Sequence, residues 1–168
     1  HRPFPQVDNL LVEIYPKLKV SSQRCEFLLC YLLELNENDG NTRINGNLLA
    51  QYVIDWDREL LPLVKETSIN SGQIHYDEDT KDLSLRTTYE NECYIATTIK
   101  DKLNNPSVWN IDWTKYRKNE YITLTDEQIK ILELICNYDF CMLVGNSGSG
   151  KSSSVKSIVE MLDDNGLS

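Results

Sequence analysis

The spacing of apolar and polar residues predicts three helices in the first half of the chain. Apolar positions three and four apart favour an amphipathic helix over residues 22–36, and a serine just before it can cap its start. Further helices are predicted near residues 47–53 and within 57–69. Because Pro62 lacks the N–H that a helix interior requires, it must lie in the first turn of the third helix or divide it.

Short β-prone runs complete the order of elements in this region. Residues 42–44 favour a short strand, and residues 73–76 and 83–86 flank a polar stretch, as the two arms of a β-hairpin do. Helix, short strand, helix, helix and hairpin is the order of a winged helix-turn-helix. Residues 21–104 are therefore predicted to form a small, mainly helical, winged-helix-like domain.

A longer helix is predicted to close this domain. Thr87 and Glu90 fit a capping box at its start, and the run 104–106 ends it with two asparagines and a proline. Its apolar stripe would consist of Ile95, Ile99 and Leu103. Residues 1–20, which three prolines punctuate, are predicted to be a leader that precedes the domain.

The last part of the chain has a different pattern. Thr125 and Gln128 form a second capping box ahead of an amphipathic helix. The continuous apolar run 140–144 favours a strand buried on both faces of a parallel sheet. A final helix should follow from about residue 151 to 162. Its buried face would hold Val155, Ile158, Val159 and Leu162.

These elements indicate an α+β chain of two parts. The winged-helix-like domain would be followed by a linker over residues 105–121. Residues 122–168 would then supply the first strand–loop–helix unit of an incomplete α/β domain. The first residue is His1 and the chain stops soon after its strongest motif, which favours a piece of a longer protein.

Composition narrows the classes of function. The 168 residues carry a net charge of −9, which argues against a protein that coats nucleic acid through charge alone. No apolar stretch is long enough to cross a membrane and no signal peptide is visible, so we expect a cytoplasmic protein with no membrane partner. Five cysteines without metal-ligand spacing favour a reduced chain with structural thiols.

The strongest motif lies between the predicted strand and the last helix, and it matches G-x-x-x-x-G-K-[ST] at every fixed position. Its glycines permit torsions that let successive N–H groups face an anion, and the following helix adds its positive end. Lys151 would reach the β- and γ-phosphates of ATP as the catalytic residue. Ser152 would ligate Mg²⁺ through its hydroxyl, and Ser153 would support the α-phosphate. The predicted nucleotide-binding set is Gly145, Asn146, Ser147, Gly148, Ser149, Gly150, Lys151, Ser152 and Ser153.

Gln128 is a further candidate for nucleotide binding. It lies one helix and one strand before the loop, and its amide offers a donor and an acceptor to an adenine edge. The alternative interpretation is structural, because Gln128 also occupies the third helical position of the capping box. Both roles are compatible with one position, since the start of the helix can face the nucleotide.

Other polar and aromatic groups each admit two interpretations. The rings and cations between residues 109 and 121 resemble a single-strand stacking surface, but packing against neighbouring domains is favoured. Three cations could contact DNA phosphates, although a solvated face is favoured for them: Arg43, Lys81 and Arg86. The aspartates between residues 77 and 82 fail the EF-hand spacing, so we interpret this stretch as a solvated turn.

Two runs of the sequence resemble the opening of the first motor domain of RecD/TraA-type superfamily 1 DNA helicases, which are exodeoxyribonuclease V alpha-subunit-like. They are residues 121–128 and residues 140–153. Thr125, Glu127 and Gln128 match the adenine-contacting LTxEQ motif of that family. The upstream half resembles the family's winged-helix-like region, including an E-x-x-I-A helix at residues 92–96. The loop reads GNSGSGKS where the family usually has GGPGTGKT, which keeps the hydroxyl chemistry.

This resemblance implies an N-terminal piece of an ATP-dependent 5′-to-3′ DNA helicase with a RecA-like motor. ATP and Mg²⁺ would be the cofactors, and single-stranded DNA the partner of the parent protein, together with proteins of a DNA repair or recombination complex. The Walker B acids and later motifs should lie beyond Ser168, so the piece alone is expected to be inactive. Two alternatives stay open: another P-loop ATPase, or a non-enzymatic winged-helix module that binds DNA or protein.

Overall fold

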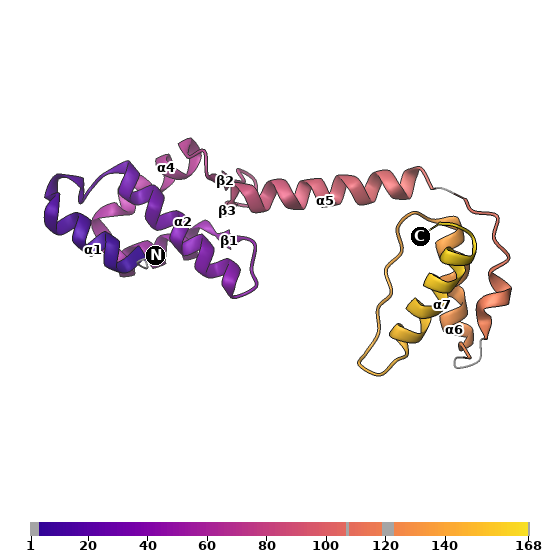
Figure 1. Ribbon diagram of the computed structural model, residues 1–168. Helices are drawn as coiled ribbons and strands as arrows, with labels where there is room; N and C mark the ends of the chain where they lie inside the picture. Colours follow the sequence, from indigo (N-terminus) through magenta and orange to yellow (C-terminus); the bar gives the residue numbers. More distant parts are fainter. Residues whose placement is uncertain (1–3, 107, 119–122, 168) are drawn as a thin grey trace. The chain divides into compact units, whose positions relative to one another are not determined.

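The computed structural model describes residues 4–106, 108–118 and 123–167 and contains helices and one small sheet (Figure 1). This mixture confirms the α+β class. The chain divides into two compact units, residues 1–94 and 95–168. The boundary lies inside one helix, α5 (Arg86–Asn104), ten residues before the end of the predicted domain.

The first unit is built from helices around a three-stranded antiparallel sheet of order β1-β3-β2. Its elements before α5 are α1 (Phe4–Ile14), η1 (Pro16–Leu18), α2 (Ser22–Asn38), β1 (Ile44–Asn45), α3 (Gly46–Asp57), η2 (Arg58–Leu63), α4 (Val64–Asn70), β2 (Ile74–Tyr76) and β3 (Asp82–Leu85). The predicted first helix and hairpin are thus confirmed. Pro62 lies in the 3₁₀ segment η2 that precedes α4, so the third helix is divided as expected.

The core of the first unit is centred on α2, which packs against the sheet and against α3, η2 and α4. Leu28, Leu29 and Leu33 of α2 are almost fully buried, and Ile74 and Leu83 face them from the strands. In the sheet, Ile44 is opposite Leu83 and Ile74 is opposite Leu85, so alternate residues present their apolar side chains to one face. This packing explains why a short sheet is retained although β1 has only two residues.

Residues 4–18 correct the expectation of a leader, because they form α1 and η1 and belong to the first unit. Phe4 stacks on Tyr31 with ring centroids 4.9 Å apart and lies 5.6 Å from the ring of Trp56. The prolines in this segment suggested a break. However, Pro5 lies in the first turn of α1, where a missing N–H costs no intrahelical bond.

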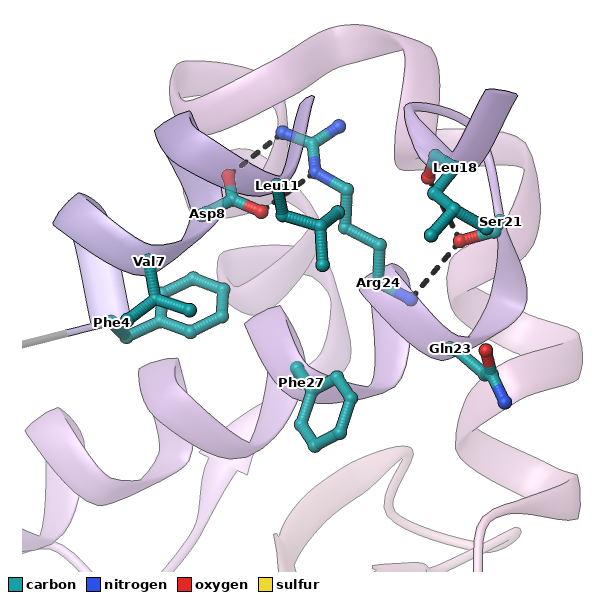
Figure 2. Close-up of a pocket in the computed structure, with 9 residues that line it drawn as sticks. All are labelled: Phe4, Val7, Asp8, Leu11, Leu18, Ser21, Gln23, Arg24 and Phe27. Carbon is teal, nitrogen blue, oxygen red and sulfur yellow. Dashed lines mark hydrogen bonds and ion pairs between the residues drawn. The ribbon is translucent and has the colours of Figure 1, made fainter. Parts of the chain in front are cut away.

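A buried ion-pair network joins α1 to α2. The Arg24 guanidinium donates from Nε and Nη2 to the two carboxylate oxygens of Asp8, each at 2.8 Å, and from Nη1 to Asp57 at 2.7 Å. Trp56 Nε1 also donates to Asp8, at 3.0 Å. Figure 2 shows Arg24 and Asp8 facing one another beside an apolar pocket of about 200 Å³ between the helices, which Leu11 helps to line.

The start and the face of α5 differ from the prediction. The helix begins at Arg86, directly after β3, because the Arg86 amide donates to the Gln73 carbonyl at 2.7 Å. Strand pairing therefore sets the helix start, and Thr87 lies inside the helix and is not its cap. Ile95 and Leu103 of the expected stripe are 56% and 50% exposed, and no described residue of α5 is buried.

The second unit is a pair of helices with a segment packed across them. Besides the end of α5, it contains η3 (Trp113–Arg117), α6 (Asp126–Asn137) and α7 (Lys151–Asp164). Its core consists of Leu124, Ile129, Leu132, Cys136 and Met161. Trp113 and Tyr116 pack against this core, as favoured for the predicted linker, while Tyr121 lies outside the described residues.

The predicted strand over residues 140–144 is corrected by the structure, which gives this run no regular hydrogen bonding. Met142 and Val144 are 71% and 78% exposed. A strand buried on both faces requires neighbours on both sides. Among the residues that the structure describes, no strand pairs with this run.

The buried face of α7 also differs from the prediction. Ser154, Ser157 and Met161 are buried, whereas Val155 and Val159 are each about half exposed. The remaining two predicted core residues, Ile158 and Leu162, are partly buried against the core of the second unit. The helix therefore packs on α6 through small serine side chains, and its inward face lies one position before the expected one.

None of the helices in the described residues is long and apolar enough to cross a membrane.

We predict that Arg24→Met destabilises the first unit by about 3–5 kcal/mol, because the buried Asp8 carboxylate would lose its partner. Hydrogen exchange of the α2 amides in the full chain measures the free energy of unfolding of the first unit separately from that of the second unit. Glu59→Gln is the control, since it breaks an exposed 2.6 Å ion pair with Lys19 that should contribute less than about 1 kcal/mol. Similar losses in the two variants would contradict a buried network.

The same network should make the stability of the first unit depend on pH. Burial raises the pKa of Asp8, but the hydrogen bonds from Arg24 and Trp56 outweigh it and lower that pKa below its usual value. Since the pKa is depressed in the folded state, the stabilisation is full above about pH 5 and is lost as pH falls below about 4. Arg24→Met should show a smaller acid dependence in the same exchange experiment.

Candidate phosphate-binding site

The loop that contains the glycine-rich motif connects the irregular run 140–144 to the first turn of α7. Gly148 and Gly150 have φ values of +78° and +81°, in the left-handed region that favours glycine. Left-handed residues that alternate with right-handed ones turn successive backbone N–H groups toward one side, which is the geometry of an anion nest. Two left-handed glycines one residue apart are compatible with such a nest, although the amide of Ser149 between them donates to the Asn146 carbonyl at 3.3 Å.

The first turn of α7 adds further donors. The amides of Ser153 and Ser154 donate to the Gly150 carbonyl, at 3.0 and 3.1 Å. Those of Lys151 and Ser152 are the first two of the helix and have no acceptor within it. The helix dipole places partial positive charge at the same end. An anion at this end would thus meet free N–H groups and a favourable field.

The Lys151 ammonium lies against the loop. Its Nζ donates to the carbonyl oxygens of Gly145 and Asn146, each at 2.6 Å, and lies 3.5 Å from Ser149 Oγ. The loop thus surrounds the ammonium group of Lys151, which is the only lysine in the motif. A phosphate that entered here would meet this charge at the mouth of the nest.

Gln128 lies at the other side of the loop, at the start of α6. The capping box predicted from the sequence is present: Thr125 Oγ1 accepts from the Gln128 amide, and Gln128 Oε1 accepts from the Thr125 amide at 2.9 Å. In addition, Gln128 Nε2 donates to the carbonyls of Ser149 and Gly150, both at 3.3 Å. A Cβ at Gly150 would overlap with this nitrogen, so an alanine there would displace the Gln128 amide from the loop.

The structure brings the predicted site residues together around one loop. Asn146, Ser147, Gly148, Ser149 and Ser152 are exposed, while Gly150, Lys151, Ser153 and Gln128 are half-buried. The assignment of Ser152 to Mg²⁺ stays a prediction. Across the described ranges no group of three or more His, Cys, Asp or Glu side chains could hold a metal ion.

One contributor was not visible from the sequence. Ser154 is fully buried, and its Oγ donates to the Gly150 carbonyl at 3.4 Å, so it helps to fix the loop where the helix begins. The motif ends before this residue, and a serine in a helix gives no local signal of such a contact.

Two thiols of the second unit lie in surroundings that disfavour the thiolate. Burial raises the pKa of both Cys136 and Cys141, which favours the protonated form at neutral pH. All five cysteines are free thiols in the structure.

The three cations considered for DNA are engaged within the first unit. Arg43 pairs with Glu92 at 2.9 Å. Arg86 donates to the carbonyls of Gly72 and Ile74, each at 2.8 Å. Lys81 donates to the Glu78 carbonyl and lies over the ring of Tyr76. These contacts account for the cations without a nucleic acid.

The aspartates nearby form a turn, as the sequence indicated. Asp77 Oδ1 accepts from the amides of Asp79 and Thr80, and these hydrogen bonds lower the pKa of Asp77. His75 stacks on Tyr89 with ring centroids 3.5 Å apart, which supports a structural role for this histidine.

Comparison with known proteins adds no relative: no protein-family model matches the chain, and no curated protein matches it. The resemblance to RecD/TraA-type helicases therefore rests on the sequence motifs alone.

We predict that Gly150→Ala disturbs the start of α7 more than Gly148→Ala does. Both substitutions cost about 1–2 kcal/mol, because alanine disfavours the left-handed conformation. Only the Cβ of Gly150→Ala also meets the side chain of Gln128, since nothing lies within 4 Å of a Cβ at Gly148. Hydrogen exchange of α7 amides measures the difference. In a Gln128→Ala background, Gly150→Ala should add no more cost than Gly148→Ala adds, and equal costs for the two single variants in the wild-type background would contradict the contact.

Proposed function

We propose that the second unit binds the triphosphate of ATP, and that the chain is part of an ATP-dependent 5′-to-3′ DNA helicase of the RecD/TraA type. The observation that carries the proposal is the loop itself. A complete G-x-x-x-x-G-K-[ST] motif opens α7, two of its glycines are left-handed, and Lys151 Nζ lies at the loop carbonyls.

Each group has a role that follows from its chemistry. The Gly150, Lys151 and Ser152 amides would donate to phosphate oxygens, and the Lys151 ammonium would neutralise charge on the β- and γ-phosphates. The Ser152 hydroxyl, on the exposed side of the first turn of α7, would be a ligand of Mg²⁺. Bound ATP–Mg²⁺ supplies the phosphoryl-transfer chemistry that drives translocation in such motors.

The finer fold assignments belong to the same proposal. The order α2, β1, α3, α4, β2, β3 supports a winged-helix-like domain, because the three strands form one antiparallel sheet. The loop between residue 144 and α7 supports the first part of a P-loop, RecA-like domain. Single-stranded DNA and proteins of a repair or recombination complex would be partners of the whole protein, in the cytoplasm.

The first unit favours a second candidate function, which is protein binding without catalysis. α3 carries no Lys or Arg, and its Leu48 and Tyr52 are 47% and 42% exposed. A helix of this composition suits an apolar protein surface better than DNA phosphates. Protein binding by the first unit is compatible with a nucleotide site in the second unit. The alternative that excludes catalysis is a winged-helix module in a chain that binds no ATP.

Lys151→Ala should weaken ATP binding by the full chain about 10- to 100-fold, because a charge-assisted hydrogen bond to phosphate is lost. Titration of the protein with a fluorescent ATP analogue in the presence of Mg²⁺ measures the affinity. Lys156→Ala is the matched control, since Lys156 is exposed on the same helix beyond the loop. Equal affinities in wild type and Lys151→Ala would exclude the phosphate role.

In a full-length protein that carries this chain, Lys151→Ala should also abolish ATP-dependent unwinding of a duplex with a 5′ single-stranded tail. A strand-displacement assay with and without ATP measures it. Retained unwinding would refute the motor assignment. ATP binding without any DNA-stimulated hydrolysis or unwinding in the full-length wild type would instead favour another class of P-loop ATPase.

A further inference from the structure

We propose that Gln128 is a positioning residue that orients the amides of the phosphate-binding loop before nucleotide binds. The proposal rests on the proposed phosphate-binding function and deepens it, because the resemblance implies only an adenine contact for this residue. Its basis is the pair of hydrogen bonds from Gln128 Nε2 to the carbonyl oxygens of Ser149 and Gly150.

The planarity of the peptide bond connects these two bonds to the anion site. Across a trans peptide, the carbonyl of one residue and the N–H of the next point in opposite directions, and the described chain contains no cis peptide bond. Holding the carbonyls of Ser149 and Gly150 toward Gln128 therefore turns the N–H groups of Gly150 and Lys151 away from it. These are the N–H groups at the entry to α7, where we place the phosphate.

The hydrogen-bonding capacity of Gln128 is nearly used up by these contacts. A glutamine amide has two N–H donors and two lone pairs. Two donors are matched by the carbonyls of Ser149 and Gly150, and one lone pair is used by the Thr125 amide. Donation to an adenine ring nitrogen would thus require release of the loop, whereas the remaining lone pair is free for an adenine amino group.

The side chain is itself held in place by a well-packed helix. Thr125 Oγ1 accepts from the Gln128 amide, and the next turn of α6 buries Ile129 and Leu132 in the core. The loop is thus held against an element that is already ordered. Donors that are preorganised in this way bind a ligand without paying the entropy of ordering the loop.

Inorganic tripolyphosphate separates this role from adenine recognition, because it has phosphates but no base. We expect Gln128→Met to weaken the binding of tripolyphosphate and of ATP by a similar factor, about three- to ten-fold, as for the loss of one or two hydrogen bonds. Calorimetric titration of the full chain measures both affinities. If Gln128→Met weakens the binding of ATP but leaves the binding of tripolyphosphate unchanged, Gln128 contacts only the adenine, and the proposal is overturned.

Hydrogen exchange of the ligand-free chain tests the same role without any nucleotide. The Ser153 and Ser154 amides are bonded to the Gly150 carbonyl, which Gln128 also holds. We expect Gln128→Met to raise their exchange rates about three- to ten-fold. Thr125→Ala, which removes only the hydroxyl of the capping box, should leave them near the wild-type rates.

The outcomes of the exchange experiment are separable from those of the titration. Unchanged exchange in Gln128→Met, or an equal rise in Thr125→Ala, would show that Gln128 acts only as a helix cap and would overturn the proposal. If the wild type binds neither ATP nor tripolyphosphate, the proposed function fails, while a rise in exchange confined to Gln128→Met would still establish the positioning role.

Discussion

The side-chain amide of Gln128 is the contact on which the candidate site depends. It joins the start of α6 to the loop that opens α7, because Gln128 bonds to two residues that lie 21 and 22 positions further along the chain. The helices meet again through Leu132 and Met161, both fully buried. The loop is thus fixed at one end by a polar bond and along its helix by apolar packing. Without the polar bond, the Ser149 carbonyl would lose its partner, while the Gly150 carbonyl would keep only its bonds from the first turn of α7.

The first unit uses a polar contact of the opposite kind, which is buried and charged. Arg24 is 7% exposed and Asp8 is 4% exposed, so both have lost most of their hydration. The bidentate geometry and the further bonds from Arg24 to Asp57 and to the Lys19 carbonyl offset this cost. The network specifies which face of α1 meets α2, whereas the aromatic contacts of Phe4 could be satisfied by several orientations.

Expectations that depend on neighbouring residues agree with the structure more often than those that depend on packing, although the capping box of Thr87 and Glu90 was wrong because strand pairing sets the start of α5. The helix at α2 and the capping box of Thr125 and Gln128 depend on residues within a few positions of one another, and both were predicted. The helix α1 was not predicted because the prolines of residues 1–20 favoured a break, and its burial against α2 depends on Arg24, which is 16 positions away from Asp8. The run 140–144 has the composition of a strand, but a strand also needs a neighbour, which composition does not supply.

The same distinction holds within the site. The motif residues Gly145 to Ser152 are a candidate set that spacing alone predicts, because each fixed position has its own chemical reason. Neither the bonds from Gln128 to the loop nor the burial of Ser154 follows from spacing, since both depend on how α6 and α7 pack. Val155 and Val159 were expected in the core for a similar reason: two stripes of α7 are compatible with helical periodicity, and only the partner helix decides between them.

The exposed run before the loop has a consequence for the behaviour of the protein in solution. Residues 140–144 contain no charge, proline or glycine, and Met142 and Val144 are mostly exposed. Uncharged β-prone segments with unpaired backbone groups are templates for pairing with the same segment of another molecule. Association of two molecules through this run would therefore rise with protein concentration, and a charged residue at Val144 would oppose it.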